Sequence, residues 1–163
     1  MTSPSWSVVT DSVSATDALA RRVSTVLAGG DVVLLAGDLG AGKTAFARGL
    51  GAGLGVTAPV VSPTFTLARV YTGRLRMVHV DVYRLDRVQE LLDLGLDDLA
   101  GDDAVTVVEW GDVVSGQFAA DRLEISLAFV PGAADSRQVT VMPRGPSWIE
   151  RLDALAAAVG RAG

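Results

Sequence analysis

Residues 32–44 read VVLLAGDLGAGKT, and this stretch decides the fold. Its first five residues form a continuous apolar run with β-branched side chains, which is typical of a buried parallel strand. The next eight match the pattern of a phosphate-binding P-loop, and a helix is predicted from about Lys43 to Leu54. These eight residues are Gly37, Asp38, Leu39, Gly40, Ala41, Gly42, Lys43 and Thr44. A strand, a glycine-rich loop and a helix in this order predict an α/β protein that binds a nucleotide.

The residue types of this loop suit phosphate groups. Gly37 and Gly42 permit backbone angles that a side chain would block, so successive amides can converge on an anion. Lys43 is expected to reach the β- and γ-phosphates of ATP, and the Thr44 hydroxyl to bind Mg²⁺. No contact with the nucleotide is expected from position 45, which follows the loop.

Lys43 also stands out in the composition. The chain has fourteen basic residues, and Lys43 is the only lysine among them. Because a guanidinium cannot imitate a compact ammonium, this single lysine favours a functional role over compositional accident.

Composition narrows the class of protein further. The chain has 163 residues, which predicts one domain over residues 1–163. It contains no cysteine, so a disulfide framework and a cysteine-based zinc site are excluded. Its N-terminus lacks the pattern of a signal peptide, and no apolar run is long enough to cross a membrane. We therefore expect a cytoplasmic protein. The net charge of −5 makes nucleic acid a poor direct partner, because binding phosphates along a strand needs a basic face.

The remaining pattern predicts the other elements of the fold. We expect a three-layer P-loop NTPase-like sandwich with a mostly parallel central sheet and an antiparallel hairpin at one edge. Strands are predicted at residues 5–10, 76–82, 104–108, 123–130 and 138–142, the last two joined by Pro131-Gly132. Helices are predicted after an N-cap at Ser14, over residues 88–99, and after a capping box at Ser147 and Glu150.

Two acids stand at or near predicted strand ends. Glu109 follows five apolar residues directly, so its carboxylate should be buried and in need of a cation. A metal is the favoured cation, and an arginine is the alternative. Asp81 is open between a metal ligand, a group that positions water, and a structural hydrogen bond. His79, the only histidine, is favoured as a packed residue over a catalytic one.

Two further segments are predicted near the nucleotide. Residues 62–66, Ser-Pro-Thr-Phe-Thr, occupy the place where P-loop proteins keep a switch loop. Their hydroxyls could contact the γ-phosphate or the metal, although a proline-shaped turn explains the spacing equally well. Trp110 follows Glu109 and is a candidate neighbour of the nucleotide, whereas a large aromatic is by default a core residue.

The motifs together resemble one family. The P-loop, the Ser-Pro-Thr segment at 62–64, the stretch His79-Val80-Asp81-Val82-Tyr83-Arg84 and the Glu109-Trp110 pair occur in this order. They resemble the bacterial TsaE (YjeE) family, the ATPase of tRNA threonylcarbamoyladenosine biosynthesis, over about residues 10–142. The resemblance implies an ATPase that works with the TsaB–TsaD protein pair. That pair transfers the threonylcarbamoyl group to adenosine 37 of tRNAs that read ANN codons.

The resemblance also implies roles for individual residues. Thr44 and Glu109 would hold magnesium, Asp81 would be needed for activity, and Thr64 would belong to a switch-like loop. Ser12, in a segment near the adenine, and Arg137 would approach the nucleotide. Trp110 is expected near the nucleotide for a separate reason, because it adjoins Glu109. With Lys43, the residues expected to act in catalysis are Asp81, Glu109 and Thr64.

Other nucleotide-binding classes remain as alternatives. A small-molecule or nucleotide kinase also has a P-loop, but it usually carries an arginine-rich lid, and the arginines here are scattered. A GTPase needs a second lysine for guanine recognition, and the chain has none. A third class is a module that binds nucleotide without hydrolysing it.

Overall fold

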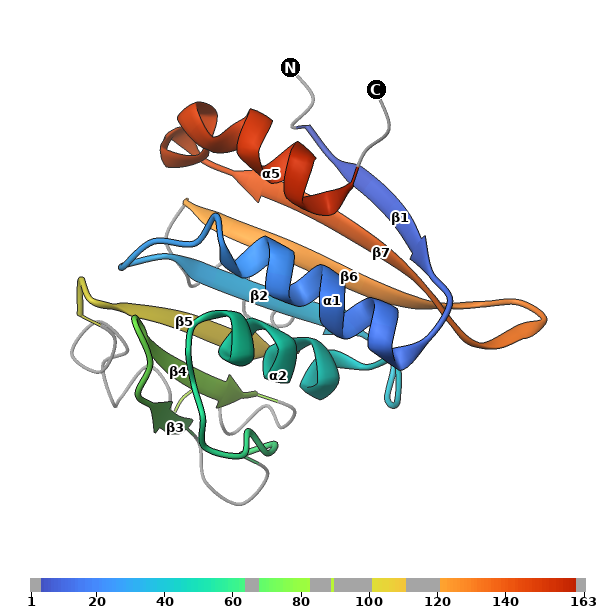
Figure 1. The fold of residues 1–163 in the computed structure, drawn as a ribbon, viewed down its shortest axis with the longest axis horizontal. Coiled ribbons are helices and arrows are strands. Elements are labelled where there is room, and N and C mark those ends of the chain that lie inside the picture. Colours follow the sequence, from blue (N-terminus) through green and yellow to red (C-terminus); the bar gives the residue numbers. More distant parts are fainter. Residues whose placement is uncertain (1–3, 64–67, 83–88, 90–100, 111–120, 161–163) are drawn as a thin grey trace.

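The computed structural model describes residues 4–63, 68–82, 89, 101–110 and 121–160. In chain order their elements are β1 (Trp6–Thr10), α1 (Val13–Ser24), β2 (Val32–Gly37), α2 (Lys43–Gly53), β3 (Ala68–Tyr71), β4 (Arg76–Asp81), β5 (Ala104–Glu109), β6 (Arg122–Val130), β7 (Ala133–Arg144), the 3₁₀ helix η3 (Pro146–Arg151) and α5 (Leu152–Val159). Strands and helices alternate as far as α2, and the strands β3 to β7 then follow one another in the described part of the chain (Figure 1).

The strands form one mixed sheet of seven, in the order β1-β7-β6-β2-β5-β4-β3. The four central strands, β6, β2, β5 and β4, are parallel to one another. Antiparallel strands flank them, with β7 and β1 on one side and β3 on the other. The predicted α/β class and mostly parallel centre are therefore confirmed. The P-loop follows β2, so the carboxyl ends of the parallel strands define the edge where a ligand is expected.

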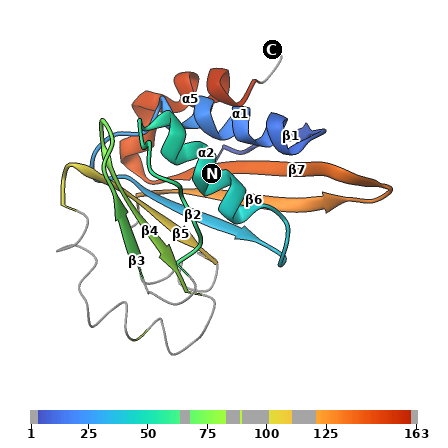
Figure 2. The same cartoon turned by 60° about the horizontal axis from the view of Figure 1, so that its bottom comes forward.

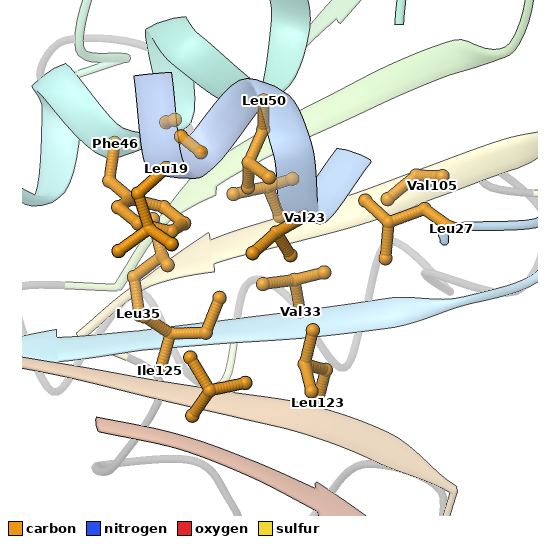
Figure 3. Packing of buried hydrophobic residues seen from close by; sticks show 14 of the residues in the cluster. Leu19, Val23, Leu27, Val33, Leu35, Phe46, Leu50, Val105, Leu123 and Ile125 are labelled. Carbon is orange, nitrogen blue, oxygen red and sulfur yellow. The ribbon is translucent and has the colours of Figure 1, made fainter. Parts of the chain in front are cut away.

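Helices α1, α2 and α5 cover the same face of the sheet (Figure 2). The main core lies beneath them, where Leu19 and Val23 of α1 and Phe46 and Leu50 of α2 pack over alternate residues of the strands (Figure 3). Because side chains alternate along a strand, the other residues of β2, β4 and β5 form a smaller cluster on the opposite face. Apart from residue 89, which is helical, the predicted helix at 88–99 lies outside the described residues.

The predicted strands and the P-loop helix are confirmed, and three details differ from expectation. The N-cap of α1 is Ser12 and not Ser14, and the Ser12 hydroxyl accepts a hydrogen bond from Ala15 N at 3.0 Å. The predicted capping box at residues 147–150 is wrong, since η3 begins after Gly145 without a side-chain cap. The β6–β7 hairpin extends the parallel strands as predicted, but β1 adds one more strand beyond it.

The sequence pattern missed β3, a short strand in which Arg69 and Val70 are exposed. Among the described helices, none has the length and apolar character needed to cross a bilayer.

Candidate functional site

The backbone of the P-loop adopts angles that favour glycine. Gly37, Gly40 and Gly42 have φ values of 149°, 82° and 107°, all in the left-handed half of the map. At Gly37 space is a second constraint, because a Cβ there would lie 2.5 Å from the carbonyl oxygen of Leu127 on β6. Helix α2 begins directly after Gly42, so its N-terminal amides face the loop. The loop therefore has the concave backbone that binds phosphate.

Lys43 lies inside this loop and is only 5% exposed. Its Nζ donates to the carbonyl oxygens of Gly37 at 2.6 Å and Asp38 at 3.0 Å. The same ammonium lies 3.7 Å from the centroid of the Trp110 ring. Backbone acceptors and an aromatic face thus hold the charge at the carboxyl end of β2, where the sequence predicts the phosphates.

The first turn of α2 carries one hydroxyl. Position 45, from which no contact with the nucleotide is expected, holds Ala45, so no second hydroxyl follows Thr44. Alanine has no side-chain donor or acceptor, which leaves the residue without a side-chain role toward nucleotide or metal. Thr44 therefore supplies the only side-chain hydroxyl of residues 37–45.

Thr44, Glu109 and His79 form a hydrogen-bonded chain beneath α2. The Thr44 hydroxyl lies 2.8 Å from Glu109 Oε1, and His79 Nε2 lies 2.6 Å from Glu109 Oε2. Glu109 is 3% exposed and His79 is fully buried. The prediction that Glu109 is buried is therefore confirmed, and its partners among the described residues include a histidine and a threonine rather than an arginine.

Asp81 ends β4 directly beside Glu109, because the two residues are register partners in the parallel β4–β5 pair. Asp81 is 7% exposed, and its Oδ2 lies 3.3 Å from the Ser62 hydroxyl. The structure thus joins the predicted switch segment to the second acid. Thr64, the residue of that segment expected to act in catalysis, lies outside the described residues.

Trp110 is the only described residue other than glycine with a positive φ, at 64°. A bulky residue rarely adopts this conformation, so the surrounding structure must hold it there. The turn directs the indole from the end of β5 back over Lys43. Trp110 therefore lies against the phosphate loop, and its contact with a nucleotide stays a prediction.

Arg137 contacts the P-loop, and Ser12 lies near Arg137 in the β1–β7 pairing. Arg137 Nε donates to the Ala41 carbonyl at 3.0 Å, and the guanidinium lies 4.6 Å from the Phe129 ring centroid. The backbone of Arg137 pairs with Thr10, the last residue of β1, and Ser12 follows two residues later. The Ser12 side chain caps α1.

The oxygen atoms at this site fit a magnesium ion. Mg²⁺ binds oxygen ligands octahedrally at about 2.0–2.1 Å, which places neighbouring ligands about 2.9 Å apart. Thr44 Oγ1 and Glu109 Oε1 are separated by 2.8 Å. No cluster of three or more His, Cys, Asp or Glu side chains suited to a metal occurs within the described ranges. A site with few protein ligands is what magnesium uses when substrate phosphates complete its shell.

His79 is buried, as the sequence predicted, but its hydrogen bond to Glu109 was not predicted. Its contact with Glu109 depends on the register of β4 against β5, which no local pattern carries. One signal was available: His79 and Asp81 are two residues apart on a strand, so both face the same side of the sheet.

Comparisons with known proteins agree with this geometry. The family model for threonylcarbamoyl adenosine biosynthesis protein TsaE matches residues 10–139. The tRNA threonylcarbamoyladenosine biosynthesis protein TsaE of Streptomyces coelicolor is 45% identical over 136 residues, covering 80% of this chain and 91% of that protein. The protein of the same name from Bacillus subtilis is 41% identical over 126 residues, covering 77% of each chain.

A solved structure extends the likeness to the whole fold. The crystal structure of Bacillus subtilis YdiB superposes with a TM-score of 0.82 at 31% sequence identity, covering 96% of this chain and 97% of that one. The family model spans both the P-loop and the β5 end, where Glu109 and Trp110 lie. On these grounds the chain belongs to the TsaE family of threonylcarbamoyl adenosine biosynthesis proteins.

Proposed function

We propose that this protein binds ATP with magnesium at the P-loop and hydrolyses it to support threonylcarbamoyl transfer to tRNA. The observation that carries the proposal is the convergence of Lys43, Thr44 and Glu109 at one end of the parallel strands. Family membership supplies the pathway, because the relatives are named for tRNA threonylcarbamoyladenosine biosynthesis.

The residues of the site would have separate roles in binding the phosphates and the magnesium ion. The amides at the start of α2 would face the phosphate oxygens, and Lys43 would exchange its two carbonyl acceptors for the β- and γ-phosphates. Thr44 and Glu109 would hold the magnesium ion, which neutralises charge on the phosphates when bound. Glu109 would then lose its hydrogen bond from Thr44 but keep the one from His79.

Asp81 is proposed to position the attacking water. It is an acid beside Glu109, and it contacts the start of the Ser-Pro-Thr segment through Ser62. An acid at this place can orient a water toward the γ-phosphate once the loop is ordered around it. Thr64 is proposed to act from the same loop, as the family resemblance implies.

The adenine is proposed to lie on the Arg137 side of the P-loop. Arg137 contacts Ala41 of the loop, and its register partner Thr10 precedes Ser12 by two residues. The Ser12 hydroxyl is used as a helix cap, so its backbone is the better candidate for contact with the base.

The partners are proposed to be proteins and not tRNA itself. The net charge of −5 disfavours direct binding to a polyanion, and hydrolysis would then act on the TsaB–TsaD pair, which makes the modification. A cytoplasmic location follows from this role.

The test is a phosphate-release assay with purified protein, with and without the TsaB–TsaD pair. We expect slow magnesium-dependent release by the protein alone and a higher rate with the pair. Glu109→Gln is the matched inactive control, because it keeps the size of the side chain and removes its charge. ATP consumption that requires a small-molecule acceptor would instead favour a kinase, and binding without turnover in either condition would favour a nucleotide-sensing module.

A further inference from the structure

His79 is buried where an apolar residue would be expected. It lies on the helix-covered face of β4, and its side chain is fully buried. Nε2 is 2.6 Å from Glu109 Oε2, whereas Nδ1 has no hydrogen-bond partner within the described part of the chain. Burying a polar ring with one nitrogen unpaired costs free energy. The hydrogen bond to Glu109 is the one described interaction of the ring that offsets this cost.

The geometry also assigns the ring hydrogen. A carboxylate can only accept, so Nε2 must carry the hydrogen in the contact with Glu109. The contact with Glu109 thus assigns the donor role to Nε2.

The two oxygens of Glu109 face different partners. Oε2 is held by His79, and this leaves Oε1 directed at Thr44. Without a donor at Oε2, the carboxylate could rotate about its terminal torsion, which is broad for glutamate. The hydrogen bond from His79 therefore fixes the orientation of the Glu109 carboxylate, as outer-shell hydrogen bonds do for metal ligands in general.

We propose that His79 is a positioning residue that fixes the Glu109 carboxylate for magnesium. This inference rests on the proposed function, since it assumes that Thr44 and Glu109 hold the ion. His79 itself would touch neither the metal nor the nucleotide, because Glu109 lies between it and Thr44.

The first experiment compares two substitutions at this position. His79→Gln keeps an N–H donor at a similar reach, and His79→Leu removes it at similar volume. Calorimetry would measure the affinity for a non-hydrolysable ATP analogue in EDTA and then across a magnesium titration. We expect His79→Leu to weaken the apparent magnesium affinity by about 10–100-fold and His79→Gln to retain most of it. Binding of the analogue in EDTA should change little in either variant.

Val78→Ala is the matched control for lost stability. Val78 is adjacent on β4, fully buried, and faces the opposite side of the sheet. It should lower the thermal midpoint and leave the magnesium dependence unchanged. If His79→Leu kept the wild-type magnesium affinity, or lost binding equally with and without metal, the positioning role would be overturned.

The second experiment needs no substitution at position 79. Because His79 is the only histidine, its ring nitrogens give a single set of NMR signals in ¹⁵N-labelled protein. We expect a hydrogen on Nε2, the nitrogen that contacts Glu109, and a shift of that signal when magnesium is added to the analogue complex. An Nε2 without hydrogen would contradict the proposal.

Measurements on the wild-type protein distinguish failure of the proposed function from failure of the inference about His79. If wild-type protein bound the analogue equally in EDTA and in magnesium, the magnesium site itself would be wrong. The role of His79 would fall with it. If wild-type binding depended on magnesium and His79→Leu preserved that dependence, only the inference about His79 would fail.

Discussion

At the scale of single residues, the site is a set of polar groups that already satisfy one another. Lys43 is bound to two carbonyls, Thr44 to Glu109, and Glu109 to His79. A nucleotide with magnesium must replace the first two of these contacts. The contacts that replace them would join opposite charges, the Lys43 ammonium to phosphate and the Glu109 carboxylate to magnesium, so this exchange favours the bound state.

Replacing Glu109 by alanine should separate binding from hydrolysis. The P-loop amides and Lys43 remain, so nucleotide should still bind. Magnesium-dependent turnover should fall by roughly 100-fold or more, the scale found when a preorganised electrostatic group is removed from an active site. Phosphate release at saturating ATP measures this, with Glu124→Ala, an acid on β6 paired with Arg122, as control. Normal turnover in Glu109→Ala would shift the role of metal-site acid to Asp81.

Trp110 should report nucleotide binding by fluorescence. Its ring lies 3.7 Å from the Lys43 ammonium, and binding of phosphates must draw that charge away. Trp6 opens β1, at the end of that strand away from Arg137, and Trp148 lies in η3. We expect the emission to change on adding ATP with magnesium, and Trp110→Phe to abolish the change. A response that survives in this variant would place the signal at another tryptophan.

At the scale of elements, α1 and α2 pack together through glycines. A Cβ on Gly49 would lie 2.6 Å from Ala20 Cβ, and one on Gly53 would overlap the Ser24 hydroxyl. These close approaches allow α2 to pack tightly against α1, while the N-terminus of α2 adjoins the P-loop. The glycines of this helix therefore serve packing, although glycine lowers helix propensity.

Gly49→Ala should destabilise the protein in spite of its better helix propensity. The substitution gains about 1 kcal/mol of intrinsic propensity, but overpacking against Ala20 and the Asp17 backbone costs about 1–3 kcal/mol. Urea unfolding should show a net loss. Gly51→Ala is the control, because its nearest neighbour is the flexible end of Met77, at 3.1 Å. Equal stability of the two variants would contradict this account of the helix pair.

The elements themselves were largely predictable, and the contacts between them were not. The apolar runs at 32–36 and 104–108 and the glycine-rich loop identify β2, β5 and the P-loop, because strand and loop chemistry is local. The β4–β5 register that brings His79 and Asp81 to Glu109 joins residues about 30 positions apart in sequence, and no local pattern encodes it. The strand β3 escaped notice because it is short and partly exposed.

At the scale of the whole molecule, the sheet brings the P-loop, Asp81 and Glu109 to the same edge. β2, β4 and β5 run parallel and end at the P-loop, Asp81 and Glu109, and β1 ends beside Arg137. Each of these groups could be named from the sequence, yet only the strand order brings them to one edge. The prediction of a single domain over residues 1–163 stays a prediction.

The proposed pathway predicts that cells lacking this protein lose a modified nucleoside from their tRNA. Depleting this protein should lower threonylcarbamoyladenosine in tRNA, because the proposed ATPase cycle would no longer support the TsaB–TsaD pair. Mass spectrometry of tRNA nucleosides measures the level. Wild-type protein should restore it, and Glu109→Gln should not. Normal levels after depletion would contradict the pathway assignment and leave nucleotide binding untouched.

The most direct test of the central claim is calorimetric titration of ATP with magnesium into the wild-type protein and Lys43→Ala. Lys43→Arg serves as a second variant that keeps the charge but not the compact ammonium, and circular dichroism checks that all three proteins are folded. We predict measurable binding by the wild type and a loss of at least about 10-fold in Lys43→Ala, since a charged contact to phosphate is worth about 1.5–3 kcal/mol. Equal ATP affinity in the wild type and a folded Lys43→Ala variant would contradict the claim that the P-loop is the nucleotide site.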